Sequence, residues 1–487
     1  MPNLNLLMSI PTILLFITWF FEPGVKKGLS RLTLKNPAAW MVGLFLVHVI
    51  WLINTSDWNY ALKDLRIKLP LLVLGVCVGS LKLNKREFKL VMAFLGLGLW
   101  IATLTGYYLY FSNPVAKLDP RVIVPDISHI RLSLMAVLFI GAGFYYLQSS
   151  DTRQKIILIV SLLNFLFFLY LIQSLTAAGI LVVAASISTI GYLLNQRKTR
   201  VIKWFVFGIV LVAVSGIVYS YQYYQSYFVK NEEALPLLKR TNSGTPYNHY
   251  DTLQVENGNI VFVNICEKEM RAAWYQRSDQ KIGSEQTRNH ELSARLIRYL
   301  TAKGLPKDSA AVYGLTSEEI QQIEMGYPAP VYAEKEGLLL RYHALLHGTH
   351  LFLVQGEAEG SSFFQRLIFW RVGWRLFKKH PFFGTGTGDV KKEIKAEYES
   401  YPVYVEPKYR LRAHNQFITF LMTFGMVGCA YFLFFLAFTT NKARHHPLFL
   451  FFMVVSIMSF LTEDTLETQA GVTFFSFFLS LFSALKE

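Results

Sequence analysis

Apolar segments recur along this chain of 487 residues, and most of them approach the length that spans a bilayer. They cover residues 4–21, 37–54, 69–81, 90–111, 132–149, 156–175, 177–194, 204–222, 415–440, 447–461 and 470–485. A transmembrane helix needs about 20 predominantly apolar residues. The pattern therefore predicts an all-α polytopic membrane protein with about 11 transmembrane helices. The expected range is about 10 to 12, because the third segment is short and the sixth and seventh almost touch.

The composition agrees with that fold class. Charged residues make up 17% of the chain, whereas soluble proteins average about 25%. The net charge of +15 would suggest nucleic acid as the partner of a soluble protein. In a membrane protein, Lys and Arg accumulate in cytoplasmic loops, so we expect membrane lipids and no nucleic acid as partners. The three cysteines, Cys77, Cys266 and Cys429, predict neither a disulfide framework nor a cysteine-based zinc site.

The charge of the loops predicts the orientation in the membrane. The basic loops all fall on one side when the apolar segments alternate across the bilayer, and they are 22–36, 82–89, 149–155, 195–203 and 441–446. The positive-inside rule makes that side cytoplasmic. The N-terminus and one very long loop then fall on the periplasmic side. The first segment lacks the basic start and cleavage site of a signal peptide, so it is expected to stay as a first span.

Three parts of the chain follow from this topology. We expect an N-terminal transmembrane bundle of about eight helices at 1–222, a large periplasmic loop domain at 223–413 and about three C-terminal transmembrane helices at 414–487. The loop domain is predicted to be mostly helical, with helices over 290–302, from Thr316 or Ser317 onward, over 334–356 and over 361–379.

A histidine stands where the loop domain meets the next apolar segment. His414 follows Arg410 and Arg412 and precedes the run that starts at 415, so it is expected at the water–lipid boundary. An ionisable group there is costly unless it is paired or used. Histidine titrates near neutral pH and can remove a proton from a hydroxyl group. The alternative is that His414 caps the helix or binds a backbone carbonyl.

Arginines and acids gather near His414 in the sequence. Arg366, Arg371, Arg375, Arg410 and Arg412 lie in the last part of the loop, and Arg131 lies just outside the fifth segment. Guanidinium groups bind phosphate through paired donors, although single arginines at this depth often reach for lipid headgroups instead. Glu463, Asp464 and Glu467 fall between the last two segments. They could neutralise the arginines, orient His414 or form an ordinary polar turn.

Two other motifs invite a functional interpretation. The stretch HPFFGTGTGD at 380–389 resembles a phosphate-binding loop, but its glycine spacing matches neither nucleotide motif, so we predict a turn with Asp389 capping the next helix. His343, His347 and His350 have the spacing of one helix face. A metal site is one interpretation, and a solvated or interfacial face is the preferred one.

The ordered set of motifs resembles the O-antigen ligase/polymerase family. The matching parts are Arg366-Leu367-Ile368-Phe369-Trp370, then His380-Pro381-Phe382-Phe383-Gly384-Thr385-Gly386, then Ala413-His414-Asn415-Gln416-Phe417 leading to Gly425 and Gly428. The resemblance implies a GT-C-like, metal-independent, inverting glycosyltransferase of the bacterial inner membrane with no cofactor. Its donor is a glycan on undecaprenyl diphosphate, and its acceptor is a lipid A core, a growing glycan or a protein.

The resemblance also implies roles for individual residues. His414 would be the general base and Arg366 would hold the diphosphate. The family often has another arginine just after a Ser-x-Thr, but this chain reads Ser174-Leu175-Thr176-Ala177 there, so Arg131 or Arg412 would substitute. The expected supporting residues are Asn415, Gln416, Glu463 and Asp464. The insertion at 223–360 exceeds the common family loop and could contact the acceptor.

Two alternatives remain open at this stage. One is a flippase or transporter of lipid-linked sugars, which carries no catalytic base. Charges within the spans and internal repeats are typical of such carriers, and neither is evident here. The other is a transferase that uses an acid of the first outer loop, Asp57 or Asp64, as its base.

Overall fold

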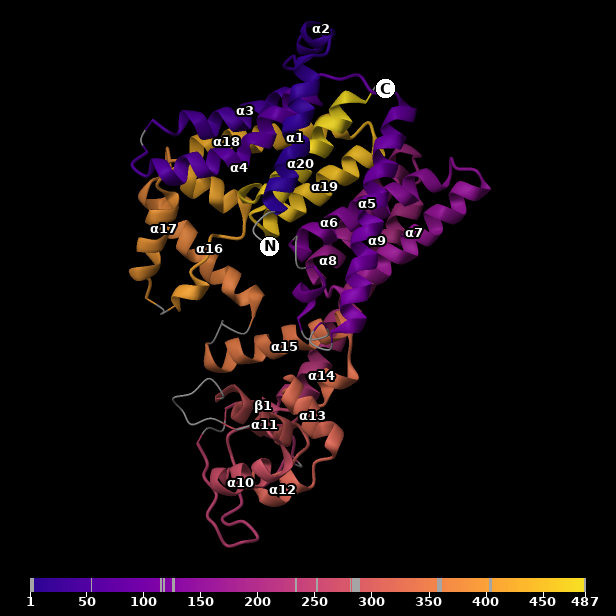
Figure 1. Cartoon of the computed structure of the whole chain (residues 1–487). Coiled ribbons are helices and arrows are strands. Elements are labelled where there is room, and N and C mark those ends of the chain that lie inside the picture. The colour runs from indigo at the N-terminus through magenta and orange to yellow at the C-terminus, as the bar shows by residue number, and fades with distance from the viewer. Residues whose placement is uncertain are drawn as a thin grey trace.

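The computed structural model describes residues 4–53, 55–113, 116, 119–124, 128–232, 234–250, 253–280, 282, 290–356, 361–402 and 405–485. These residues are mostly helical, and the only sheet among them is the short pair β1 (Val255–Glu256) and β2 (Asn259–Ile260). Figure 1 shows a broad group of helices at one end of the molecule and a smaller helical unit at the other.

Every apolar segment of the sequence contains a helix. These helices are α1 (Leu4–Phe20), α3 (Pro37–Ile50), α4 (Trp58–Cys77), α5 (Lys85–Ser112), α6 (His129–Leu147), α7 (Thr152–Leu171), α8 (Leu175–Asn195), α9 (Thr199–Phe228), α18 (Gln416–Ala443), α19 (Pro447–Thr462) and α20 (Gln469–Ala484). Within the described residues, six of them are long and apolar enough to cross a membrane: α5, α6, α7, α8, α9 and α18. The predicted class of helical membrane protein is therefore supported, while the number of spans stays a prediction.

Close packing of small and aromatic residues holds these helices together. Lipid tails are as apolar as the helix surfaces, so helices associate in a bilayer through tight packing and interhelical hydrogen bonds. At Gly79 an added Cβ would lie 2.4 Å from the Cβ of Ala38, so the chain after α4 approaches α3 too closely for any side chain. Fully buried phenylalanines, such as Phe432 and Phe452, fill the space between α18, α19 and α20.

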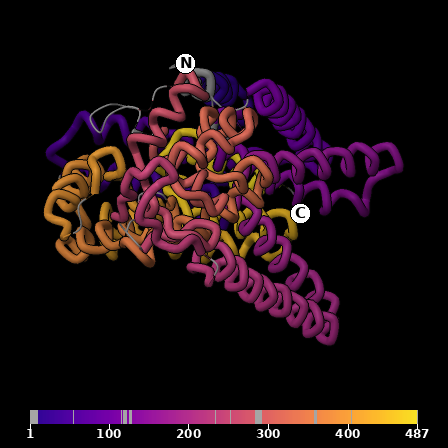
Figure 2. Tube along the Cα trace, turned by 90° about the horizontal axis from the view of Figure 1, so that it is seen from below, coloured from indigo at the N-terminus to yellow at the C-terminus, as the bar shows by residue number. Residues whose placement is uncertain are grey.

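The long helix α9 differs from the rest of the bundle. The most apolar part of this helix buries none of its residues against the protein, and Figure 2 shows α9 projecting away from the other helices. An apolar helix that is exposed all round suits a lipid environment. Its last turns continue past residue 222 to Phe228, which is buried among aromatic rings of the loop region.

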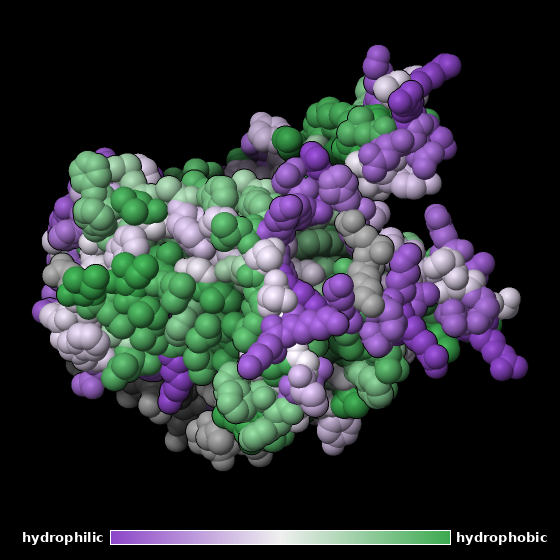
Figure 3. All heavy atoms as spheres, turned by 90° about the horizontal axis from the view of Figure 1, so that it is seen from above, coloured by the Kyte–Doolittle hydropathy of each residue, from purple (hydrophilic) through white to green (hydrophobic). Residues whose placement is uncertain are grey.

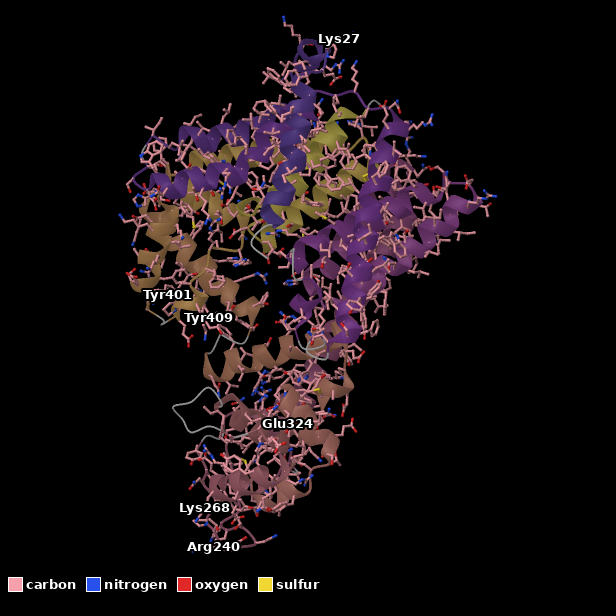
Figure 4. All side chains as sticks on the ribbon, in the orientation of Figure 1. Lys27, Arg240, Lys268, Glu324, Tyr401 and Tyr409 are labelled. Atoms are coloured by element: carbon pink, nitrogen blue, oxygen red, sulfur yellow. The ribbon has the colours of Figure 1, made fainter. Side chains whose placement is uncertain are left out.

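The basic loops gather at one end of the molecule. The Leu83 N–H donates to the carbonyl of Ala484 at 2.8 Å, so loop 82–89 meets the C-terminal helix. Arg31 donates to the carbonyl of Ser80, so loop 22–36 meets the chain just before loop 82–89. Figure 1 places α2 (Val25–Leu29) and the C-terminus at this end, and Figure 4 labels Lys27 there. The start of α1 points toward the opposite end, where the loop region lies. Figure 3, which views the basic end, shows hydrophilic side chains gathered between wide hydrophobic areas.

The region between α9 and α18 is divided into two packed parts. The outer part has its own core around Trp274 and Leu296. Its helices are α10 (Glu267–Arg277), α11 (His290–Ala302), α12 (Ser309–Tyr313), α13 (Ser317–Met325), α14 (Val331–Glu334) and α15 (Gly337–Gln355). The predicted helix starting at Thr316 or Ser317 is confirmed, because the Thr316 side chain caps α13 and Glu319 completes a capping box. In Figure 2 this part covers the bundle when the molecule is seen from below.

The other part lies directly against the membrane helices. It consists of α16 (Ser362–Lys379), α17 (Val390–Glu399) and the chain that runs through the 3₁₀ turn η3 (Pro407–Tyr409) to α18. Phe369 and Val372 of α16 share a core with Ile394 of α17 and with Met422 of α18. The entry to α18 is therefore fixed on the side of α16 and α17.

The three histidines on α15 are expected to form a solvated or interfacial face, and the solvated face is wrong for His343 and His350. His343 and His350 are almost fully buried, and their Nδ1 atoms lie 3.0 Å and 3.2 Å from the hydroxyls of Tyr223 and Tyr224 at the end of α9. Burial lowers the pKa of His343 to about 4, so its imidazole is neutral. The last turns of α9 supply these tyrosines, and local helix spacing could not reveal that partner.

Candidate functional site

The site begins with a short non-helical segment that places His414 at the N-terminal end of α18. Asn415 caps α18, because its side-chain oxygen accepts from the N–H groups of Phe417 and Ile418 at 3.0 Å and 3.1 Å. The residue before the cap, His414, has a φ of +45°, which is uncommon for a side chain other than glycine. A backbone in this region must be held by its surroundings, so the conformation itself indicates a site built around His414.

Asp464, in the turn between α19 and α20, holds this backbone. Its carboxylate accepts from the N–H of His414 at 2.9 Å, from the N–H of Asn415 at 3.1 Å and from the hydroxyl of Thr419 at 2.7 Å. Asp464 is 6% exposed, and burial raises its pKa. Removing the carboxylate would leave two backbone donors buried without partners, so Asp464 sets the position of His414.

Glu463 orients the ring of His414. The Nδ1 atom of His414 lies 3.1 Å from a carboxylate oxygen of Glu463, and the other oxygen accepts from Nη2 of Arg366. Burial alone would raise the pKa of Glu463, but the hydrogen bond from His414 and the charge of Arg366 lower it overall. Glu463 is thus an anion that bridges the predicted base and the predicted diphosphate ligand.

The other ring nitrogen of His414 is available for chemistry. A carboxylate on Nδ1 favours the tautomer that carries the proton there and leaves a lone pair on Nε2. Within the described residues, Nε2 has no hydrogen-bond partner, and the side chain is 32% exposed. The ring of Phe369 lies beside it, with centroids 5.7 Å apart. The ring is thus oriented from one side and reachable from the other.

Glu467 is the centre of a second charged network, which lies next to the His414 segment and contains Lys68 and Arg412. It accepts from Nζ of Lys68 at 2.7 Å, from Nη1 of Arg412 at 2.7 Å and from the side chain of Gln416 at 3.1 Å. Burial by itself would raise the pKa of Glu467, but the positive charges of Lys68 and Arg412 outweigh it and lower that pKa. Arg412 also donates to the hydroxyl of Tyr60 in α4. This network ties α4, the His414 segment and the α19–α20 turn together.

Arg131 lies deeper than the other predicted arginines. It is 5% exposed, its Nε donates to the hydroxyl of Thr468 at 3.3 Å, and Nη2 donates to the carbonyl of Asp464 at 3.4 Å. Its Nη1 is buried without a hydrogen-bond partner in the described chain. Arg131 therefore supports the turn that carries Glu463 and Asp464, and its Nη1 group is left to bind another acceptor.

The glycine-rich stretch 380–389 fits against a kink in α18. Gly425 has a φ of +64°, and around it the carbonyls of Met422 and Thr423 accept from the N–H groups of Thr385 and Gly386 at 3.0 Å and 2.8 Å. A Cβ on Gly384 would lie 2.4 Å from the backbone of Thr423. The predicted turn is present, and its glycines let two backbones touch at the kink.

The prediction that the Asp389 side chain caps the following helix is wrong. Asp389 occupies the N-cap position of α17, but its side chain makes no capping bond. Its carboxylate accepts instead from the N–H of Ser56 at 2.9 Å, from the hydroxyl of Ser56 at 2.5 Å and from the N–H of Asp57 at 3.1 Å. The segment before α4 supplies these donors in place of the first turn of α17, and it is thereby anchored to the site.

A basic pocket of about 410 Å³ opens beside this network. Arg412 and Asp64 line one side of the pocket, and the cations around it are Lys63, Lys391, Lys395 and Arg410. Asp64 is the only acid among its lining residues, so the pocket suits an anionic group. Its wall is formed by α4, α17 and the segment that leads to His414.

The structure therefore brings together most of the residues that the sequence singled out. Seven of them contact one another or the turn at 463–468, and they are Arg131, Arg366, His414, Asn415, Gln416, Glu463 and Asp464. Arg412 reaches the same turn through Glu467 but faces the basic pocket. Sequence reasoning missed Lys68 and Tyr60, and a lysine directly before the apolar run that starts at Leu69 was the available signal for the first of them.

Asp57 and Asp64, the alternative bases, have other partners, and Asp64 lies within α4 and not in a loop. Asp57 caps α4 by accepting from the N–H of Tyr60 at 2.9 Å, and Asp64 is 6% exposed and 3.4 Å from Lys68. Among the described residues, no group of three or more His, Cys, Asp and Glu side chains is arranged to hold a metal ion.

Residues 329–433 match the family model described as O-antigen ligase. The matched segment contains α15, α16, α17, the glycine-rich stretch, His414 and the first part of α18, so it includes the motifs on which the predicted resemblance rests. The predicted resemblance is thereby confirmed over these residues. A search of curated protein sequences gives no match to the chain.

Proposed function

We propose, on the match of residues 329–433 to the family model described as O-antigen ligase, that this chain is a membrane glycosyltransferase of the ligase or polymerase type. The donor is a glycan on undecaprenyl diphosphate, and the acceptor is a hydroxyl of a lipid A core, a growing glycan or a protein. The reaction takes place at the end of the bundle away from the basic loops. We assign that end to the periplasmic side of a bacterial inner membrane, since the basic loops mark the cytoplasm.

The observation that carries this proposal is the arrangement of His414, Glu463 and Arg366. A histidine oriented by a buried carboxylate and reachable at Nε2 has the geometry of a general base. Arg366 lies on the other oxygen of the same carboxylate, so a cation that suits diphosphate stands next to the base. The proposed transfer needs both groups, because the acceptor hydroxyl loses a proton while the diphosphate leaves the donor sugar.

The proposed reaction is a single displacement. The acceptor oxygen attacks the anomeric carbon while its proton passes to Nε2 of His414. The bond between that carbon and the diphosphate oxygen breaks, and undecaprenyl diphosphate leaves with the electron pair. Attack opposite the leaving group inverts the anomeric configuration. Glu463 stabilises the imidazolium that forms, as a carboxylate does for other catalytic histidines.

Arg366 has enough N–H donors to bind Glu463 and the diphosphate leaving group at the same time. A guanidinium carries five N–H donors. In Arg366, Nη2 binds Glu463, and Nη1 has only a 3.5 Å contact with the carbonyl of Ser362 in its own helix. Arg412 and the basic pocket offer a second place for negative charge on a substrate. Stabilising the charge that develops on a leaving group is commonly the largest electrostatic contribution to such a step.

The direct test uses purified protein, undecaprenyl-diphosphate-linked glycan and candidate acceptors. We expect release of undecaprenyl diphosphate and a glycosylated acceptor, with the same rate when a chelator is present. Movement of the donor across vesicles without any release would instead identify a carrier. Loss of the reaction with chelator would overturn the metal-independent mechanism.

Arg366→Lys is expected to lower the rate of transfer by about tenfold or more, because lysine cannot hold Glu463 and a phosphate oxygen with one planar fork. The measurement is the initial rate of undecaprenyl diphosphate release at saturating donor. Arg371→Lys is the matched control, since Arg371 is exposed on the same helix. Equal rates in the two variants would remove Arg366 from the mechanism.

Lys391→Ala combined with Lys395→Ala is expected to raise the apparent KM for the anionic substrate about tenfold and to change kcat little. Each cation near a bound anion contributes on the order of 1 kcal/mol, and these two line the basic pocket without touching His414. The control is Lys392→Ala with Lys408→Ala, which removes the same charge from positions outside the pocket. A similar KM in both double variants would exclude the pocket from substrate binding.

A further inference from the structure

A second basic cavity lies at the opposite end of the molecule, among the loops assigned to the cytoplasm. Its volume is about 1190 Å³, and its walls come from the ends of α5, α6, α18 and α20. Its cations are Lys85, Lys89, Lys442 and Arg444, joined by His445 and His446. No acid is among its lining residues. This cavity is therefore more one-sided in charge than the pocket beside Arg412, which Asp64 lines, and it lies far from the transfer site.

The four cations of this cavity have no carboxylate partner among the residues that the structure describes. In the described part of the chain, none of them has an ion pair with Asp or Glu. Lys89 lies over the ring of Tyr146, and Arg444 donates to the ring of its neighbour His445. Cations that gather around a hollow without counter-ions favour an anion from outside.

An apolar groove continues from this cavity between α5, α6 and α7. The groove holds about 610 Å³, and Lys89 and Tyr146 line both hollows, so the two are contiguous. Apart from Lys89 and a few polar side chains near α7, its lining is apolar, with Trp100, Phe139 and Leu162 along its length. Lys89 thus stands where a charged end would meet a hydrocarbon end.

We propose that the cavity and the groove together bind an anionic phospholipid of the leaflet on the basic side. The phosphate of the headgroup lies among Lys85, Lys89, Lys442 and Arg444, and an acyl chain lies in the groove past Trp100. Basic pockets between helices on the cytoplasmic side are a known mode of recognising acidic headgroups. A soluble anion would use the cavity but leave the groove without an occupant, so the combination favours a lipid.

The bound lipid would join two parts of the bundle. The cavity lies between the ends of α5 and α6 on one side and the ends of α18 and α20 on the other. The described chain links these parts at this end through the bond from Leu83 to Ala484. The lipid is thus expected to stabilise the arrangement in which α18 carries His414, without taking part in the transfer.

The test is retention of lipid by the full-length protein in native mass spectrometry, after purification with phosphatidylglycerol or with phosphatidylcholine. We expect preferential retention of phosphatidylglycerol. Replacing Lys85, Lys89, Lys442 and Arg444 together by Gln should reduce it by about tenfold or more, since these four charges would hold the headgroup phosphate. The control removes four exposed charges of the same face that do not line the cavity, at Lys27, Lys198, Arg200 and Lys203.

The groove is tested separately by Ala93→Trp, because Ala93 is exposed and lines the groove. The added ring should displace the acyl chain and reduce phosphatidylglycerol retention, with all charges intact and little effect on folding. Equal retention of the two lipids by the parent protein would overturn the proposal. Equal retention by the cavity variant and its control, or an unchanged level in Ala93→Trp, would overturn it as well. Neither readout depends on glycan transfer.

Discussion

Transfer by His414→Ala is expected to fall by about 10²–10⁴-fold, the usual contribution of a positioned general acid or base. The acceptor hydroxyl would have no nitrogen to receive its proton, whereas Glu463 would keep its bond with Arg366 and the donor site would stay formed. The measurement is undecaprenyl diphosphate release together with binding of the lipid-linked donor. We expect donor binding within about twofold of the parent protein, since general-base catalysis acts on the chemical step.

A second substitution separates the role of the imidazole from that of the backbone. The φ of +45° at His414 suits asparagine better than alanine, so His414→Asn should fold with less strain. Both variants should be equally inactive if the imidazole is the base. Recovery of transfer in His414→Asn would show that the backbone conformation matters and that the ring does not. His380→Ala, an exposed histidine at the end of α16, is the control and should keep its activity.

The sequence predicts this site because its parts are local. The cap at Asn415, the histidine before it and the arginine of α16 are each carried by a short motif, and apolar length alone predicts where the helices lie. The structure adds how they meet. The turn at 463–468 reaches the His414 segment only through the packing of α18, α19 and α20, and no periodicity along the chain encodes that approach.

The predictions that proved wrong are those in which a distant partner outcompeted a local rule. Asp389 follows the rule for a helix cap, but Ser56 and Asp57 offer its carboxylate better donors. His343 has the spacing of an exposed helix face, but the tyrosines at the end of α9 bury it. Both errors concern polar groups whose partners lie far away in the chain, and such pairings depend on the tertiary fold.

Lys68 is another polar group whose partner could not be predicted from the sequence. A fully buried ammonium is tolerable only with a paired carboxylate, and the structure supplies Glu467 at 2.7 Å and Asp64 at 3.4 Å. Lys68 by itself predicts that a partner exists, but not which acid it is. The choice of Glu467 matters for function, because the same carboxylate holds Arg412 and Gln416 next to His414.

Glu467→Gln is therefore expected to destabilise the protein by about 3–5 kcal/mol, the range for removing one partner of a buried ion pair. Lys68 would remain buried with only the longer contact to Asp64, and Arg412 would keep only the hydroxyl of Tyr60 as its acceptor. The measurement is the unfolding midpoint in detergent. Glu267→Gln is the matched control, because Glu267 forms a partly exposed pair with Arg271, and such pairs contribute about 0–1 kcal/mol.

A double variant tests whether the loss arises from the unpaired charge. Lys68→Met in the Glu467→Gln background removes the stranded ammonium and should restore part of the stability, because a buried ion pair can often be replaced by apolar groups at little cost. Arg412 would still lack its carboxylate, so recovery should be incomplete. If Glu467→Gln unfolds no earlier than Glu267→Gln, the network around Glu467 does not hold α4 against the turn, and the support proposed for the His414 segment is absent.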